Sequence, residues 1–430
     1  MSKQQTTQWG AIIVMIALFA MIAFVTNLCS PMGVIVKNQF GTTNFMAMIG
    51  NYGNFMAYLL MGFPAGMCIK KYGYKKTALI GLLVGIIGII VQWLSGWGGM
   101  AVYLIGALIS GCCMCILNTV VNPMLNLLGG GGNKGNQLIQ IGGVFNSSAA
   151  VAVYIIMGAL IGDAAKAKIS DATPALMIAL AIFVIAFIVI AFTKIEEPQQ
   201  PVEEKKGEKD PHSAFSFRHF NLGILAIGLY GGVEMGIPGY ILQYLTAATD
   251  APTPGLAMDA SYVGTLSALF FIFMLIGRFI GGVVGGKVST KAMITFVSTA
   301  AIILIALGIF LPTTLTVSVP GIDYTNMKLM WGDLPIGVFC FLLVGLCASV
   351  MWGGIFNLAT EGLGKYTAIA SGAFMTMVCG FAIMVGVQGL VADWTGSYLT
   401  SFWVPLACAA YILYYALIGS KNVNTDIKVD

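Results

Sequence analysis

The amino-acid sequence predicts an all-α integral membrane protein with twelve transmembrane helices arranged as two six-helix bundles. Of its 430 residues, 58% are hydrophobic and only 9% are charged, and the mean hydropathy is +0.90. A soluble chain of this length needs a larger charged fraction to cover its surface. Apolar runs of about 18 residues or more, which are long enough to cross a bilayer as helices, fill nearly the whole chain.

The twelve predicted spans follow one another through short loops. The first apolar run extends from Trp9 to Val36. It is too long for the apolar core of a secretory signal peptide and has no A-x-A cleavage site, so we interpret it as a spanning helix. Glycine and proline interrupt many spans, which helices packed in a bundle tolerate. In chain order the spans are 10–36, 44–69, 76–95, 100–128, 137–162, 174–193, 219–246, 261–286, 291–313, 334–360, 367–392 and 397–419.

A polar segment divides these spans into two halves. Residues 194–212 are charged, rich in proline and poor in apolar side chains, which predicts a flexible linker. We therefore expect an N-terminal six-helix bundle over residues 1–193, a cytoplasmic linker over 194–218 and a C-terminal six-helix bundle over 219–430. Paired halves around a site at the membrane midplane are the plan of many secondary transporters.

Lysine and arginine set the expected orientation. If both ends of the chain are cytoplasmic, most of these residues fall on cytoplasmic loops and helix ends. The positive-inside rule therefore predicts a multi-pass protein of the inner membrane with both termini in the cytoplasm. The few basic residues left on the outer side are Lys37, Lys166, Lys168 and Lys328.

Several kinds of chemistry are not indicated by the sequence. The nine cysteines lie mostly in apolar runs without a C-x-x-C pair, so we interpret them as small packing residues rather than a disulfide or metal framework. The glycines 129–132 are not followed by the G-K-[ST] of a phosphate loop. No Ser/His/Asp or metal-ligand constellation indicates an enzyme. We expect no catalysis, cofactor, bound metal or nucleic-acid partner.

Glu234 is a lone acid in the middle of the seventh span, between closely spaced glycines. A charged side chain at bilayer depth costs roughly 2.5–3.5 kcal/mol on insertion scales, so it is retained for a function or is satisfied in protonated form by a neighbouring helix. No lysine or arginine falls at the predicted midplane, since Arg278 and Lys37 lie toward span ends, where they can snorkel or anchor loops. An acidic cargo needs a buried cation, so a neutral cargo is favoured.

Amides and aromatic rings are the candidate substrate-binding groups. Asn118, Asn122 and Asn126 share one helical face. An unpaired amide in hydrocarbon costs several kcal/mol, so this face is directed at a cavity or a partner helix. Both interhelical bonding and sugar contact stay open. A hydroxylated ring needs flat apolar faces and bidentate hydrogen-bonding partners. The candidates are Asn27, Asn51, Asn118, Asn122, Gln140, Asn146, Tyr230, Gln243, Trp352, Asn357 and Gln388.

Four groups of motifs, distributed over nearly the whole chain, carry a family resemblance. They are Pro64 to Lys76; Asn122-Pro123 with Phe145-Asn146-Ser147; Gly232-Val233-Glu234 with Gly277-Arg278-Phe279; and Ile355-Phe356 with Gly362-Leu363-Gly364 and residues 389–393. Together they resemble the major facilitator superfamily, and within it the fucose/glucose–galactose:cation symporter branch. The resemblance implies two six-helix bundles that rock about a central site. It also implies that conformational gating involves Lys70, Lys71, Lys75, Lys76 and Arg278.

The chain departs from this branch at the positions that carry protons in its fucose members. Those members have one acid in the first helix and another four residues before the N-P asparagine, where this chain has Ser30 and Asn118. Neither side chain can take up and release a proton at physiological pH. The fifth-span motif also differs, with Leu138, Gln140 and Gly143. Glu234 is left as the central titratable group, and Glu234 and Ser30 are the ion-coupling candidates.

The sequence thus predicts a secondary active transporter that imports a neutral monosaccharide or related sugar by alternating access, coupled to H⁺ or Na⁺. We expect it to act as a monomer in the lipid bilayer. One alternative keeps the fold and takes an acidic sugar or organic anion as cargo, which predicts that Lys37 or Arg278 reaches the cavity. Another is a sugar sensor that does not transport. Drug export is not favoured, because the fifth span has no G-P-x-x-G-G element.

Overall fold

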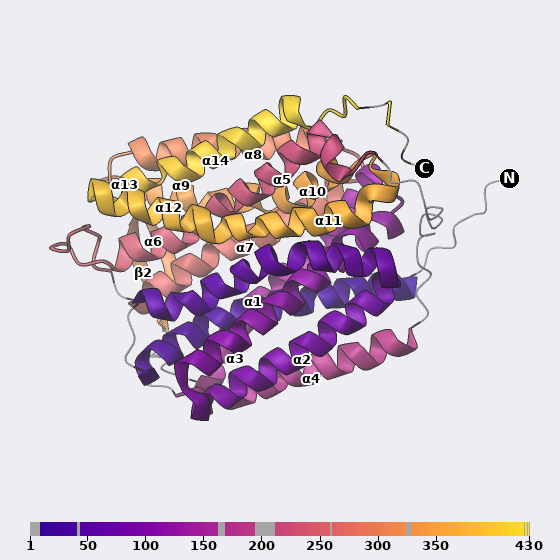
Figure 1. Cartoon of the computed structure of the whole chain (residues 1–430). Helices are drawn as coiled ribbons and strands as arrows, with labels where there is room; N and C mark the ends of the chain where they lie inside the picture. The colour runs from indigo at the N-terminus through magenta and orange to yellow at the C-terminus, as the bar shows by residue number, and fades with distance from the viewer. Residues whose placement is uncertain are drawn as a thin grey trace. The chain divides into compact units, whose positions relative to one another are not determined.

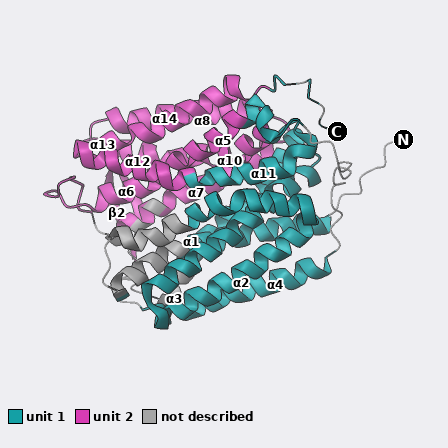
Figure 2. Ribbon diagram, viewed as in Figure 1, with its two compact units in different colours: residues 1–220, 360–379, 422–430 teal, residues 221–359, 380–421 magenta. Residues whose placement is uncertain are grey.

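The computed structural model describes residues 9–40, 44–161, 168–193, 211–258, 260–323, 328–424, 426, 427 and 429 (Figure 1). These residues are almost all helical, with one two-stranded sheet. The chain forms two compact units (Figure 2). Most of the predicted linker, residues 194–210, lies outside the described residues. The predicted bundle boundaries therefore remain a prediction.

The first unit comprises Met1–Phe220, Thr360–Cys379 and Asn422–Asp430. Within it α1 packs against α2 and α3, and α2 also packs against α4 and α11. Its helices are α1 (Trp9–Phe40), α2 (Asn44–Leu128), α3 (Gly132–Ile161), α4 (Thr173–Phe192) and α11 (Thr367–Thr376), with short 3-10 turns at Ile169–Ala172, Ala214–Ser216, Gly364–Tyr366 and Met377–Cys379.

The long helix α2 is three helices joined by two sharp turns. Gly73 (φ 82°) and Gly99 (φ 79°) have positive φ values inside it, which glycine adopts without the steric cost of a Cβ atom. Both turns fall between predicted spans, so α2 corresponds to the second, third and fourth. Divided there, the described helices follow the order of the twelve predicted spans. Eight stretches of the described chain are apolar and long enough to cross a membrane, and one of them has 75 residues.

The second unit comprises Asn221–Ala359 and Gly380–Lys421. In it α7 and α8 pack against α9, and α14 packs against α8. Its helices are α5 (Arg218–Gly231), a π-helical turn η3 (Gly232–Gly236), α6 (Ile237–Thr246), α7 (Ala260–Val284), α8 (Thr290–Phe310), α9 (Ile336–Ala348), α10 (Met351–Thr360), α12 (Gly380–Thr395), α13 (Tyr398–Ser401), α14 (Trp403–Tyr414) and a second π-helical turn η6 (Tyr415–Gly419).

A β-hairpin, which the sequence analysis did not predict, joins α8 to α9. Strands β1 (Thr316–Asp323) and β2 (Lys328–Pro335) pair antiparallel, with Val319 opposite Gly332. One face is held by Tyr262 of α7, whose hydroxyl lies 2.8 Å from the Val319 carbonyl oxygen and 2.9 Å from that of Gly332. The other face leaves Trp331 63% exposed. The alternation follows from the two-residue period of a strand.

Large apolar side chains cover the outer helix surfaces, as a lipid environment requires. Phe192 of α4 is 88% exposed and Phe296 of α8 is 74% exposed. Only 28% of the most apolar window of Ile169–Phe192 is buried. So many exposed large apolar side chains are unusual for a soluble monomer. The predicted all-α integral membrane fold is thus confirmed.

Candidate functional site

The second unit contains a buried ion pair. Arg278 Nη2 of α7 lies 3.8 Å from Glu234 Oε1, and the two side chains are only 8% and 13% exposed. At an effective dielectric constant of about 20, unit charges at this distance attract by about 4 kcal/mol, which desolvation of both groups offsets in large part. The pair carries no net charge. The expectation that Arg278 snorkels at a span end is therefore wrong: its long side chain reaches the central acid instead.

Glu234 lies in the π-helical turn η3, where the seventh span departs from regular α-helix. Pro238 follows four residues later and has no amide hydrogen to donate to the Glu234 carbonyl, and its ring clashes with that carbonyl in a regular helix. Widening of the turn relieves the clash. Glycines on both sides let neighbouring helices approach closely, since a Cβ atom at Gly231 meets Phe381 of α12. The sequence G-G-V-E-M-G-I-P therefore positions the acid.

Arg278 also binds the break in the tenth span. Helix α9 ends at Ala348 and α10 begins at Met351, which frees backbone carbonyl groups between them. Arg278 Nε donates to the Ser349 carbonyl oxygen at 3.3 Å, and the Tyr230 hydroxyl donates to that of Ala348 at 3.0 Å. Gly277 permits this approach, because a Cβ atom there meets the Ser349 side chain. Side chains of the seventh and eighth spans thus donate hydrogen bonds to the carbonyl groups at the break.

Three aromatic rings pack together beside the ion pair. The Tyr230 ring centroid is 6.4 Å from that of Trp352 and 5.8 Å from that of Phe381, and the Trp352 and Phe381 centroids are 6.1 Å apart. Tyr230 is fully buried, whereas Trp352 is half-buried. An aromatic face next to charged hydrogen-bonding groups suits the C–H surface and the hydroxyls of a sugar ring.

Gln388 of α12 adds an unused acceptor to this region. It is fully buried, and its Nε2 donates to the Ser401 hydroxyl at 3.4 Å. Among the described residues its Oε1 has no hydrogen-bond partner, and it lies against Gly236 of the Glu234 turn. A buried unpaired acceptor costs about 1–3 kcal/mol. Such a group is a candidate partner for a bound molecule or for a protonated acid.

The first unit holds the asparagine row. Asn118 Nδ2 donates to the Tyr58 hydroxyl at 2.8 Å, and Asn122 Nδ2 donates to the Asn118 carbonyl oxygen at 2.9 Å. Asn118, Asn122 and Tyr58 are buried, whereas Asn126 is half-buried. One turn before Tyr58, Asn54 is also buried, and neither of its amide atoms has a hydrogen-bond partner within the described part of the chain. The row therefore makes an interhelical bond through Asn118, and the unsatisfied amide of Asn54 lies one turn from its partner Tyr58.

The remaining amide candidates lie in different places. Asn146 Nδ2 donates to the Phe19 carbonyl oxygen at 2.8 Å and joins α3 to α1. Asn27 Nδ2 bonds Ala23 of its own helix at 2.8 Å. Gln140 Nε2 bonds Asn136 at 3.4 Å. Asn357 is buried and Gln243 is exposed, while the side chains of Asn51 and Ser30 lie outside the described residues. For Asn146 the geometry supports interhelical bonding.

The lysines after the second span lie at the surface. Lys70, Lys71 and Lys76 are exposed. Lys75 Nζ donates to the carbonyl oxygens of Ala191 at 3.0 Å and Thr193 at 2.9 Å, and so binds the C-terminal end of α4. Cations are favourable there, because the last carbonyl groups of a helix carry partial negative charge. A role in conformational gating remains a prediction.

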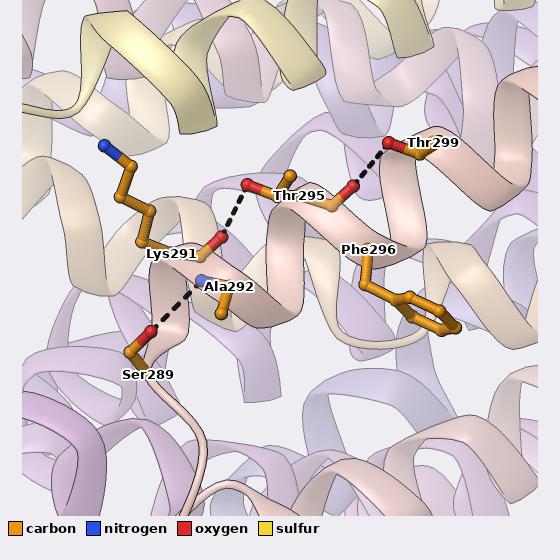
Figure 3. A pocket seen from close by; sticks show the side chains of 6 residues that line it. All are labelled: Ser289, Lys291, Ala292, Thr295, Phe296 and Thr299. Atoms are coloured by element: carbon orange, nitrogen blue, oxygen red, sulfur yellow. Dashed lines mark hydrogen bonds between the residues drawn. The ribbon is translucent and has the colours of Figure 1, made fainter.

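A surface hollow on α8 does not provide a polar site (Figure 3). It is lined by Ser289, Lys291, Ala292, Thr295, Phe296 and Thr299. The Thr295 and Thr299 hydroxyls bond carbonyl oxygens one turn back, each at 2.8 Å. Lys291 Nζ donates to the Leu417 carbonyl oxygen at 2.8 Å. These groups are already satisfied, so the candidate site remains the Glu234 region.

Comparison with known proteins identifies the family. A profile of the Major Facilitator Superfamily matches residues 14–387 of the chain. The chain belongs to this superfamily. It is therefore a multi-pass membrane transporter and not an enzyme, and the resemblance stated from its motifs is confirmed.

The chain is similar to named sugar transporters of the superfamily. It is 30% identical to the glucose/galactose transporter of Brucella abortus biovar 1 (strain 9-941), over 94% of this chain and 93% of that protein. It is 23% identical to the L-fucose-proton symporter of Escherichia coli K12, over 95% and 92%. Among solved structures it resembles the superfamily transporter FucP in the outward conformation, with a TM-score of 0.79, 21% identity and coverage of 96% and 99%.

Sequence reasoning found Glu234 but missed its partner. The signal was present, because Arg278 lies in an apolar run. An opposite charge at the same depth lowers the free-energy cost of burying the acid. The Ser349 carbonyl and the Tyr58 hydroxyl gave no comparable signal. Their contacts depend on which helices are neighbours, which spacing within one helix does not reveal.

Proposed function

We propose that the protein imports a neutral monosaccharide or closely related sugar by alternating access, coupled to a cation, H⁺ or Na⁺, through Glu234. The observation that carries a neutral cargo is the ion pair. While Glu234 is ionised, it balances Arg278 at 3.8 Å, so the ion-paired site offers an anion no net positive charge. The similar glucose/galactose and fucose transporters support a sugar as the cargo.

The protein lies in the inner membrane with both termini in the cytoplasm, as the distribution of lysine and arginine favours. We expect it to act as a monomer. Uncharged side chains bind the sugar, with Trp352 as the stacking face and buried amides as hydrogen-bonding partners. No resident cofactor or metal takes part, since the driving force is the ion gradient.

A thermal-shift screen tests the binding part. Purified protein is heated with D-glucose, D-galactose, L-fucose and the anionic D-glucuronate, with and without Na⁺ and at several pH values. A bound sugar stabilises the folded state by RT ln(1 + [L]/Kd), about 2.7 kcal/mol at a concentration of 100 Kd. Stabilisation by a neutral sugar is expected. Stabilisation by glucuronate alone contradicts a neutral cargo and favours the organic-anion alternative.

Uptake measurements test transport itself. Proteoliposomes are given an inward proton or sodium gradient and a labelled sugar that the screen identified. Accumulation above the external concentration under either gradient is the expected result. Binding without accumulation or exchange under any gradient indicates a sensor that does not transport.

A further inference from the structure

We propose that Arg278 links protonation of Glu234 to the break in the tenth span, and that the ion taken up at Glu234 is a proton. The inference rests on the proposed function, because it concerns how sugar uptake is driven. Arg278 is a positioning residue in this scheme. It affects the sugar through Glu234 and the α9–α10 break rather than by contact with it.

The geometry places one rigid group between two elements. Arg278 Nη2 lies 3.8 Å from Glu234, while its Nε donates to the Ser349 carbonyl oxygen at 3.3 Å. The guanidinium is planar, so a shift at one end moves the other. Trp352 follows Ser349 by three residues and packs on Tyr230. A change in charge at Glu234 is thereby transmitted to the half-buried ring.

The arginine also decides which cation Glu234 accepts. A sodium ion needs several oxygen ligands, and at this carboxylate it faces the positive guanidinium. A proton bonds directly to one carboxylate oxygen and needs no coordination shell. Protonation turns Glu234 into a hydrogen-bond donor, and the unpartnered Gln388 Oε1 lies against the same π-helical turn. The surroundings therefore fit a proton.

Each transport cycle takes up one proton at Glu234 and releases it on the other side. On the loading side a proton from solution adds to the Glu234 carboxylate, which becomes a neutral carboxyl. Arg278 keeps its charge and loses its counter-ion, so its favourable contacts are then the carbonyl oxygens at the break. Release of the proton to the other side restores the carboxylate and the ion pair. No other reactant is consumed.

The other groups near Glu234 do not compete for this proton. The elements packed against η3 are α6, α9, α12 and α14, and Arg278 and Tyr230 face Glu234 from α7 and α5. Phenols and thiols lose their protons only at alkaline pH. Among the described residues of the four packed elements, the titratable groups are Tyr240, Tyr244, Cys340, Cys347, Asp393, Cys408, Tyr411 and Tyr414, of which Asp393 is exposed.

The test compares gradient-driven uptake with gradient-free exchange in proteoliposomes, using D-glucose, D-galactose and L-fucose as probes. The variants are E234Q, R278Q, R278K and the double variant E234Q/R278Q. R218Q, which removes the other arginine of the chain, is the matched control. Far-ultraviolet circular dichroism and size-exclusion profiles confirm that each variant is folded.

E234Q resembles the protonated acid, and it is expected to lose proton-driven accumulation by at least about tenfold more than it loses gradient-free exchange. R278Q leaves an unpaired buried carboxylate and is expected to lose exchange as well, while the double variant recovers exchange only. R278K is expected to restore exchange with a shifted pH profile of uptake. R218Q is expected to behave as the unaltered protein.

Two outcomes overturn the inference while leaving sugar import intact. One is an R278Q protein with unaltered accumulation and pH profile. The other is accumulation by the unaltered protein under a sodium gradient but not a proton gradient. Absence of both uptake and exchange of every probe by the unaltered protein contradicts the proposed function instead.

Discussion

At the scale of single residues, the buried bond between Asn118 and Tyr58 connects the second and fourth spans. The donor and acceptor are 2.8 Å apart and 60 residues apart in the chain. In hydrocarbon neither group has water as an alternative partner. The bond therefore specifies which helices are neighbours. Removing one of the two polar groups is expected to lower stability more than removing both.

We predict that Asn118→Leu lowers stability by about 1–3 kcal/mol, because it leaves the Tyr58 hydroxyl buried without a partner. Adding Tyr58→Phe is expected to recover part of the loss, since both polar groups are then gone. Thermal unfolding in detergent without sugar measures the stability of both single variants and of the double variant. Strictly additive effects of the two changes contradict a direct bond.

Glu234 and Arg278 show what sequence reveals about single residues. An isolated acid in an apolar run is visible without any structure, because its cost in a membrane does not depend on its neighbours. Its partner is not, because pairing depends on which faces of two helices meet. The amides illustrate the same limit: spacing put Asn118 and Asn122 on one face, and only coordinates show that Asn146 bonds Phe19.

At the scale of elements, α2 and α11 of the first unit meet through small residues. Gly62 and Gly66 are four apart on α2, and Gly372 and Thr376 are four apart on α11. A Cβ atom at Gly66 lies 3.2 Å from the Gly372 Cα, and one at Gly62 meets the Thr376 side chain. Small residues at this spacing let helix backbones approach closely in membranes.

We predict that Gly62→Leu destabilises the protein by about 1–3 kcal/mol, because the larger side chain overpacks the α2–α11 contact. Gly386→Leu is the matched control, since a Cβ atom there meets nothing within 4 Å. Thermal midpoints of the two variants are compared in the same detergent. Equal midpoints contradict the close approach of the two helices.

We predict that Tyr262→Phe loosens the β-hairpin. The hydroxyl lies 2.8 Å and 2.9 Å from carbonyl oxygens of β1 and β2, and losing the bond to the buried Val319 carbonyl costs about 1–3 kcal/mol. Amide hydrogen exchange in the two strands is expected to quicken by roughly tenfold for each 1.4 kcal/mol. Exposed Tyr72 supplies the control Tyr72→Phe, for which strand exchange is expected to stay unchanged.

The elements differ in how far sequence predicts them. Long apolar runs predict where the spanning helices lie, because the thickness of the bilayer sets the length of such a run. The hairpin was missed, since its alternation covers only eight residues per strand and Pro320 interrupts the first. The π-helical turn was missed as well, although Pro238 four residues after Glu234 was its signal.

At the scale of the whole molecule, orientation follows from charge. We predict that an Asp333→Cys variant in the hairpin is labelled by an impermeant maleimide in intact cells, whereas Ser213→Cys is labelled only after permeabilisation. Both positions are exposed. The unaltered protein is the control, because its described cysteines are buried or half-buried. The reverse labelling pattern contradicts cytoplasmic termini.

Composition alone predicts the class of this molecule, because 58% hydrophobic and 9% charged residues leave few alternatives to a membrane. The motifs then predict the superfamily. Neither predicts the sugar, since hydroxyl stereochemistry is recognised by small differences in amide placement. The departures at Ser30 and Asn118 direct attention to Glu234 but do not reveal how its charge is balanced.

The charge balance within the second unit has a consequence for biosynthesis. Glu234 and Arg278 are 44 residues apart on consecutive helices, so the ribosome delivers the acid first. Until the second helix emerges, the acid has no counter-ion and its helix partitions into lipid less readily. We therefore expect the two helices to leave the translocon together. Slowing translation between them is expected to favour quality-control degradation of the nascent protein.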